Sequence, residues 1–213
     1  YLVNVTVNGF KKTVKLIIIA ILIALVNRSI SQTKYESIKM EEQYEKALVN
    51  YQTFKQLVNE VDTHRAKRLV SLNTFLAMSR DSNTLILDTR SLYRYNRKHI
   101  KGAIHLNFSD FTQAALNKRI PLNDKTRILI YCNNNFKNDQ IDFTSKVAYP
   151  TRIREFDLTG ISQPRTLALN IPTYLNLYGY GYRNIYELDE LVSTYDKRLR
   201  LEGSAVKTRN QKD

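Results

Sequence analysis

The chain has 213 residues, enough for one domain with extensions, and its hydrophobic and charged fractions of 43% and 25% are ordinary for a globular protein. Its formal charge of +13 favours anionic substrates or surfaces. The basic residues are scattered and carry no RNA-binding or helix-turn-helix signature, so nucleic acid is not expected as a partner.

The first element is an apolar segment with the pattern of an export signal. Lys11, Lys12 and Lys15 precede an unbroken apolar run from Leu16 to Val26, and the pattern Ser29-Ile30-Ser31 follows after Asn27 and Arg28. A basic region, a short apolar region and small residues at positions −3 and −1 predict a secretory signal peptide that is cleaved after Ser31. The alternative is an uncleaved anchor in the inner membrane, although the run is shorter than the roughly 20 residues of a comfortable span.

Residues 1–31 are accordingly assigned to upstream residues plus a signal peptide, which places the mature protein in a bacterial periplasm or outside the cell. Membrane contact is expected only through an uncleaved signal segment. Stable disulfides form in such a compartment, but Cys132 is the one cysteine of the chain and has no internal partner. Cys132 is therefore a candidate reactive thiol.

The stretch from Tyr35 to Glu60 is predicted to form one helix. Its apolar residues recur at spacings of three and four, and its acidic residues lie early, where they complement the helix dipole. Residues 32–67 are thus predicted to be an N-terminal amphipathic helix with a basic link. The apolar face is expected to pack against the domain that follows, with a membrane surface or a partner helix as the alternative.

Strands and helices alternate over residues 68–200. This alternation predicts an α/β fold in which helices cover both faces of a central, mainly parallel sheet. The expected elements are a short strand and then a helix capped by Ser71 or Asn73, strand Thr84–Leu87, strand Ile104–Leu106, a helix from Asp110 to Asn117 capped by Ser109, strand Ile128–Tyr131, helix Thr166–Tyr178 and strand Asn184–Tyr186.

Three asparagines, Asn133, Asn134 and Asn135, follow Cys132 at the end of a buried strand. Asparagine tolerates left-handed backbone angles, so the chain is expected to curl into a loop whose N–H groups point inward. Such a nest binds anions and would stabilise a thiolate, so the pKa of Cys132 is expected below that of an ordinary thiol. The alternative is that Cys132 is a small buried hydrophobic residue.

Several ordered motifs resemble those of the rhodanese-like domain. Asp88 to Arg90 follows a strand, His99 to Ala103 matches the family's Gly-His-Ile-Pro-Gly-Ala, a later strand ends in Cys132, and Gly179 to Leu188 matches Gly-Tyr-x-Asn-Val-x-x-Leu. The resemblance covers about Leu69 to Tyr195. It implies the rhodanese fold and a cysteine that carries sulfur.

By this resemblance, Cys132 would accept a sulfane sulfur and become a persulfide. The loop residues would cradle it with backbone N–H groups: Asn133, Asn134, Asn135, Phe136 and Lys137. Four further residues would support the site structurally: Asp88, Arg90, His99 and Gly102. The implied partners are a small anionic sulfur donor and a thiol or cyanide-type acceptor, with no cofactor.

The sequence departs from the family pattern at several positions. Asn135 stands where glycine is usual, and Lys137 stands where arginine is usual, which keeps the charge but loses the bidentate fork. Arg94, Lys98 and Lys101 replace the usual glutamate, glycine and proline. These changes add positive charge on loops that border the expected site, which favours an anionic donor.

Two segments extend the family pattern. Residues 139–165 form an insertion directly after the Cys132 loop, which is expected either to shape access to Cys132 as a flap or to be a passive excursion. Residues 201–213 are expected to be a disordered basic tail.

Two functions remain open from the sequence. The first is an exported sulfurtransferase or persulfide carrier that uses Cys132, and the second is a catalytically inactive rhodanese-fold binding or scaffold module of the cell envelope. A cysteine phosphatase is least favoured, because it needs an arginine six residues after the cysteine and this chain has Asn138 there. One cysteine and three scattered histidines do not predict a metal site.

Overall fold

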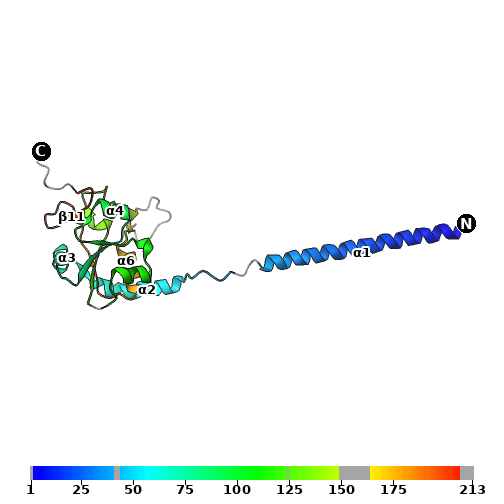
Figure 1. Ribbon diagram of the computed structural model, residues 1–213, viewed down its shortest axis with the longest axis horizontal. Helices are drawn as coiled ribbons and strands as arrows, with labels where there is room; N and C mark the ends of the chain where they lie inside the picture. The colour runs from blue at the N-terminus through cyan, green and yellow to red at the C-terminus, as the bar shows by residue number, and fades with distance from the viewer. Residues whose placement is uncertain (1, 41–43, 124, 149–163, 207–213) are drawn as a thin grey trace, which may run out of the picture. The chain divides into compact units, whose positions relative to one another are not determined.

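A computed structural model describes residues 2–40, 44–123, 125–148 and 164–206. The chain divides into two compact units, Tyr1–Asn50 and Tyr51–Asp213. Helix α1 (Leu2–Met40) makes up most of the first unit, and the second unit contains a sheet with helices (Figure 1).

Helix α1 contains a segment, Phe10–Lys34, that is long and apolar enough to cross a membrane. It includes the apolar run from Leu16 to Val26, whose side chains are exposed. A helix of this kind near the N-terminus is compatible with a signal sequence and with a membrane anchor. Cleavage after Ser31 stays a prediction.

The single helix predicted from Tyr35 to Glu60 is wrong in its extent. Helix α1 ends at Met40, residues 44–50 are not helical, and helix α2 (Tyr51–Ala66) begins only at Tyr51, while residues 41–43 lie outside the described residues. The physical reason is packing. The side chains of residues 44–50 are exposed, whereas α2 buries Val61 in the core, and helices in proteins gain most of their stability from such contacts.

The second unit is built on a five-stranded sheet in which all neighbouring strands run parallel. This confirms the predicted mainly parallel sheet. The strand order is β1-β9-β5-β2-β4, and the strands are β1 (Leu69–Val70), β9 (Ile185–Leu188), β5 (Arg127–Tyr131), β2 (Thr84–Asp88) and β4 (Ile104–His105). The register pairs Asp88 with Tyr131, so β2 and β5 end side by side at one edge of the sheet.

Helices cover both faces of this sheet, as predicted. The alternation of β5 divides its side chains between two cores: Ile128 and Ile130 pack with α2 and α6, and Leu129 and Tyr131 pack on the opposite face. The remaining helices are α3 (Leu72–Met78), α4 (Leu92–Arg97), α5 (Gln113–Arg119) and α6 (Asn170–Gly179). Helices α2, α5 and α6 contribute to the first core, and α3 contributes to the second.

Capping residues decide where the short helices begin. Of the two predicted caps of α3, Ser71 and Asn73, Ser71 is the one that caps the helix, by accepting the N–H of Thr74 at 3.3 Å. The helix predicted from Asp110 to Asn117 is present as α5, but its predicted start and its cap at Ser109 are wrong. Asn107 caps a short 3₁₀ turn, η1 (Phe108–Asp110), and α5 begins separately after Thr112, whose hydroxyl accepts the N–H of Ala115 at 3.1 Å.

Helix α6 also begins later than predicted. Residues Arg165–Thr166 form strand β8, which pairs antiparallel with β7 (Val147–Ala148) and thereby takes the chain out of the helix. Pro172 lies in the first turn of α6, where its missing N–H costs no hydrogen bond, so it starts the helix rather than kinking it.

The segment after residue 200 is ordered as far as the structure describes it, so the predicted disordered tail is wrong for residues 201–206. Strand β11 (Leu201–Glu202) pairs antiparallel with β3 (His99–Ile100). The buried side chain of Leu199 and this backbone pairing hold the segment on the domain. Residues 207–213 lie outside the described residues.

The described part of the insertion is also held on the domain. Phe143 is fully buried, and residues 147–148 pair with β8. Residues 149–163, which include most of the predicted flap, lie outside the described residues.

Candidate functional site

Cys132 lies directly after β5, at the carboxyl edge of the parallel sheet, where ligands of α/β proteins gather. Its residue surface is 1% exposed. The Sγ atom accepts the backbone N–H of Leu169 at 3.3 Å and a second N–H from Asn133. Leu169 is the residue before α6, so the sulfur lies near the positive end of a helix dipole.

Burial raises the pKa of the Cys132 thiol above its ordinary value. The two backbone N–H groups and the nearby Arg90 lower it, and Asp88 raises it further, but desolvation of the thiolate is the largest effect. The predicted lowering of this pKa is therefore wrong. The sequence could show the polar neighbours of the cysteine but not the depth at which it lies.

The loop after Cys132 is a tight 3₁₀ turn, η2 (Asn133–Asn135), and not an open nest. The N–H of Asn135 donates to the carbonyl of Cys132 at 3.2 Å, and the N–H of Phe136 donates to the carbonyl of Asn133. The N–H groups of Asn135 and Phe136 are therefore used within the turn. Besides the N–H of Asn133, the sulfur accepts that of Leu169, which is 37 residues further along the chain.

The side chain of Asn135 fixes the turn. Its Oδ1 accepts the N–H of Cys132 at 2.9 Å and the Asn170 amide at 2.8 Å, and its Nδ2 donates to the carbonyl of Leu188 at 2.6 Å. Asn135 therefore joins the cysteine to β9 and to the start of α6. It stands where the family pattern has glycine, and the 3₁₀ turn at this position requires no left-handed backbone angle.

The other predicted loop residues have different positions. Asn134 contacts the insertion: its Oδ1 accepts the N–H of Lys146 at 2.7 Å, and its Nδ2 donates to the Lys146 carbonyl at 3.1 Å. Phe136 is buried in the second core, and Lys137 is exposed on β6 (Phe136–Lys137), which pairs with β10 (Val192–Ser193). Neither Phe136 nor Lys137 lines the cavity beside Cys132.

That cavity has a volume of about 350 Å³. Cys132 and Asn133 form part of its wall, and three cationic residues also line it: Arg90, Arg94 and Lys146. Arg90 is buried and paired, Arg94 is half-buried, and Lys146 is exposed. No aspartate or glutamate among the described residues lines the cavity, so its field favours an anion.

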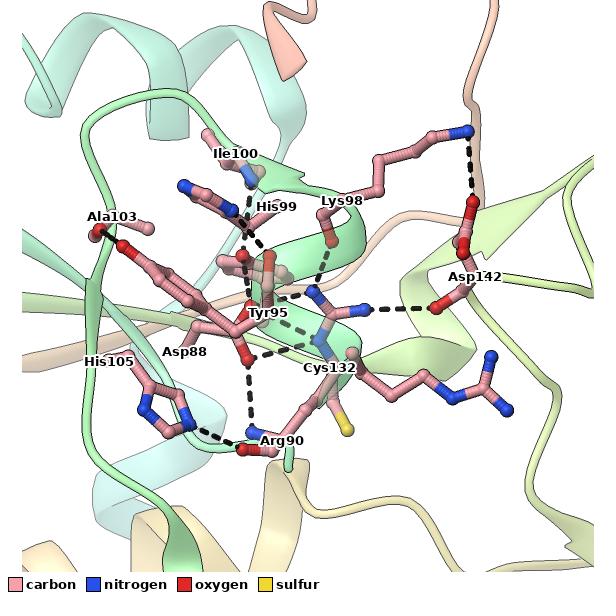
Figure 2. A network of polar contacts seen from close by, with 12 residues as sticks. Asp88, Arg90, Tyr95, Lys98, His99, Ile100, Ala103, His105, Cys132 and Asp142 are labelled. Atoms are coloured by element: carbon pink, nitrogen blue, oxygen red, sulfur yellow. Dashed lines mark hydrogen bonds and ion pairs between the residues drawn. The ribbon is translucent and has the colours of Figure 1, made fainter. Parts of the chain in front are cut away.

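Figure 2 shows the buried ion pair of Asp88 and Arg90, and Arg90 is also one of the residues that line the cavity. Arg90 contacts Asp88 at 2.7 Å, and Tyr131 donates its hydroxyl to the same carboxylate at 2.6 Å. Arg90 also donates to the carbonyls of Lys98 at 2.6 Å and Asp142 at 3.1 Å. The pair therefore ties β2 and β5 to the start of the insertion, and both charges have hydrogen-bond partners.

His99 lies on the side of this network away from the sulfur (Figure 2). Its ring stacks on Tyr95 at 3.8 Å between ring centres, and its Nε2 lies 3.2 Å from Glu202. Gly102 has a φ of +80° and donates its N–H to Glu202 at 2.9 Å. Both residues hold the C-terminal segment, and neither lines the cavity at Cys132.

Sequence reasoning missed several residues of the site. Lys146 lies within the insertion and Leu169 shortly after it, and Tyr131 was expected only as a buried strand end. Asp142 was also missed. Its carboxylate forms ion pairs with Arg97 at 2.6 Å and with Lys98 at 3.2 Å. These cations lower the pKa of Asp142, although burial acts in the opposite direction. The unusual Lys98 was the available signal, because an added cation implies an acidic neighbour.

Within the part of the chain that the structure describes, no group of three or more His, Cys, Asp or Glu side chains is arranged to hold a metal ion.

Comparison with protein families agrees with the fold. Residues 71–157 match the family model of the rhodanese-like domain. No curated protein matches the chain. A crystal structure of the BH2092 protein from Bacillus halodurans is similar at 17% identity, covering 69% of this chain and 87% of that one, with a TM-score of 0.41. The family model thus identifies a rhodanese-like domain over residues 71–157 of this chain.

Proposed function

We propose that this protein is a sulfurtransferase or persulfide carrier in which Cys132 holds a sulfane sulfur. The observation that supports this most strongly is the place of Cys132 in the wall of a cavity that Arg90, Arg94 and Lys146 also line. A thiol is the reactive group and the cations favour a small anionic donor such as thiosulfate.

The first half-reaction converts the thiol to a persulfide. Cys132 loses its proton to solvent, and the thiolate attacks the outer sulfur of thiosulfate. A new S–S bond forms to Cys132 while the S–S bond of thiosulfate breaks, and sulfite leaves with the electron pair. The N–H groups of Leu169 and Asn133 contact the sulfur of Cys132 and stabilise its negative charge.

The second half-reaction returns Cys132 to its starting state. The thiolate of a small acceptor attacks the outer sulfur of the persulfide, and the Cys132 thiolate leaves with the electron pair of the broken bond. The acceptor then carries the sulfane sulfur as its own persulfide. The 350 Å³ volume of the cavity suits small donors and acceptors.

The test is intact-mass spectrometry of the full chain after incubation with thiosulfate, followed by peptide mapping. The proposal predicts a gain of one sulfur atom on Cys132 that a reducing thiol removes. Cys132→Ser is the control and gains none. If wild-type protein and Cys132→Ser remain equally unmodified, the sulfurtransferase proposal is wrong.

A second candidate function is an anion-binding module without sulfur transfer. It is favoured by the 1% exposure of Cys132 and the raised pKa of its thiol, which both reduce reactivity. Calorimetry separates the two candidates. The binding module is supported if thiosulfate binds to the wild-type protein but leaves no sulfur on Cys132. Its affinity should then fall in an Arg94→Gln, Lys146→Gln variant.

We further propose that the protein is exported to the cell envelope. The apolar segment Phe10–Lys34 supports either a cleaved signal or an anchor. Fractionation of cells that produce the full chain, with N-terminal sequencing of the product, tests this. A mature terminus at Gln32 supports a cleaved signal, an intact chain in the membrane fraction supports an anchor, and an intact chain in the cytosol contradicts export.

A further inference from the structure

A second hollow lies away from Cys132, beside helix α3 and next to strands β2 and β3. Its volume is about 560 Å³, and it shares no described lining residue with the cavity at Cys132. We call it the basic groove, defined by the five cationic residues that line it: Arg80, Lys101, Lys197, Arg198 and Arg200.

The basic groove carries positive charge that the described part of the chain does not pair. Arg198 is paired with Asp196 at 2.6 Å. Lys101 lies near Glu202 and helps to lower the pKa of that carboxyl, so its charge is partly offset. The side chains of Arg80, Lys197 and Arg200 make no hydrogen bond or ion pair with described residues, and no described aspartate or glutamate lines the groove. These cations around one hollow create a local field that favours a multiply charged anion.

The floor of the basic groove is apolar. Ile86 and Ile100 are 7% and 3% exposed, and the half-buried Leu76 of α3 lies beside them. Because the two isoleucines are almost fully buried, the apolar surface still open to a ligand is chiefly that of Leu76 and the exposed Ala77. A ligand with only charged groups would leave this surface in contact with water. An apolar portion next to the anionic group would cover it and gain the free energy of burying apolar surface.

The backbone around the basic groove is fixed before any ligand binds. The N–H of Lys101 donates to the carbonyl of Arg200 at 2.8 Å, and Leu199 between the cations is buried. Arg198 also donates to Asn73 of α3 at 2.6 Å, which joins the C-terminal segment to that helix. A preformed arrangement reduces the entropy lost on binding.

We infer that the basic groove is a binding site for an organic phosphate, meaning a phosphate monoester attached to a short apolar body. Arginine offers a planar fork that matches phosphate oxygens, and lysine adds a point charge. A monoester carries up to two negative charges, which suits the unpaired charges of Arg80, Lys197 and Arg200. The same chemistry occurs in free phosphorylated metabolites and in lipid headgroups with a terminal phosphate.

The test is isothermal titration calorimetry of the full chain in nonionic detergent with phenyl phosphate and with inorganic phosphate. Phenyl phosphate is expected to bind at least about fivefold more tightly, because its ring covers the apolar floor. Equal affinity for the two ligands would contradict the organic-phosphate class.

The matched variants reverse the same amount of charge at two places. Lys197→Glu with Arg200→Glu is expected to weaken phenyl phosphate binding at least about tenfold, and Lys197→Gln with Arg200→Gln by an intermediate factor. Lys118→Glu with Arg119→Glu, on the exposed side of α5, is the control and should change affinity by less than about twofold. Equal losses in both charge-reversal variants would show an unspecific effect of net charge and overturn the site.

Two further arms distinguish binding in the basic groove from binding in the Cys132 cavity and from general affinity for nucleic acid. An Arg94→Gln, Lys146→Gln variant should bind phenyl phosphate as wild type does, and a loss there would place the ligand in the Cys132 cavity instead. If a random oligonucleotide displaces phenyl phosphate from the protein at a lower concentration than that of phenyl phosphate, the proposal is also overturned.

A competition experiment with dihexanoyl phosphatidic acid identifies the source of the ligand. If this lipid competes with phenyl phosphate for the basic groove, the natural ligand is a lipid headgroup. If phenyl phosphate binds and the lipid does not compete, the natural ligand is a free metabolite.

Discussion

At the scale of single residues, the reactivity of Cys132 is set by opposing effects on its thiolate. Burial disfavours the charged form, whereas the N–H groups of Leu169 and Asn133 favour it. Because burial is the larger effect, the pKa of the thiol lies above its ordinary value. A neutral thiol is therefore the dominant form at pH 7, and the reactive thiolate becomes more abundant as the pH rises.

Alkylation of Cys132 is expected to accelerate with pH through a midpoint above about 8.5, the pKa of a free thiol. The direction follows from the raised pKa, since only the thiolate reacts. Rates with iodoacetamide, followed by intact mass from pH 6 to pH 10, check this. A midpoint at or below that of a free cysteine peptide would contradict the buried environment of the sulfur.

The cations of the cavity should reverse the usual preference between two alkylating reagents. Iodoacetate is anionic and iodoacetamide is neutral, so Arg94 and Lys146 are expected to favour the reaction with iodoacetate. The ratio of the iodoacetate rate to the iodoacetamide rate should be about tenfold higher for Cys132 than for a free thiol. The Arg94→Gln, Lys146→Gln variant should lose this preference while its pH midpoint changes little. The same preference in wild type and variant would mean that these cations do not act on Cys132.

The buried pair of Asp88 and Arg90 should be costly to break. Asp88→Asn leaves the guanidinium of Arg90 without its counter-charge and is expected to reduce the free energy of unfolding by about 3–5 kcal/mol. Asp81→Asn removes the partner of the more exposed Arg127 and should cost at most about 1 kcal/mol. Urea unfolding of both variants checks the difference, and similar losses would show that the buried pair has no special role.

At the scale of elements, the C-terminal segment depends on one glycine. Gly203 has a φ of +128°, and a Cβ atom there would lie 2.5 Å from the carbonyl oxygen of Arg97. Gly203→Ala should therefore displace β11 from β3, at a cost of about 1–3 kcal/mol. Gly102→Ala is the comparison, because no atom lies within 4 Å of its Cβ position and only its φ of +80° is strained.

Hydrogen exchange measures this displacement directly. The N–H of Lys101 donates to the carbonyl of Arg200, so its exchange should accelerate more in Gly203→Ala than in Gly102→Ala. Unchanged protection in Gly203→Ala would mean that the segment accommodates the added methyl group without leaving the domain.

The elements of the sheet could be predicted from the sequence because their signals are local. The apolar run of β5 and the capping residue Ser71 of α3 need no information about distant parts of the chain. The helix predicted from Tyr35 failed for the opposite reason. Its apolar spacing continues through residues 44–50, but only α2 finds a surface on which to pack.

At the scale of the whole molecule, the site combines segments that are far apart in the chain. Cys132 and its turn could be identified from the sequence, but the partners Lys146 and Leu169 are brought to it by the paired strands β7 and β8. The burial of Cys132 is likewise a property of the assembled domain. This is why the position of Cys132 at the end of β5 was predictable and the direction of its pKa shift was not.

The sulfur balance of a single turnover tests the central claim most directly. Full-length protein is mixed with excess thiosulfate, and both the sulfite released and the sulfur gained by Cys132 are quantified on the same samples. The account predicts one sulfite for each Cys132 persulfide, and neither product with Cys132→Ser. Sulfite release that persists in Cys132→Ser, or the absence of both products from wild-type protein at every pH up to 10, would contradict it.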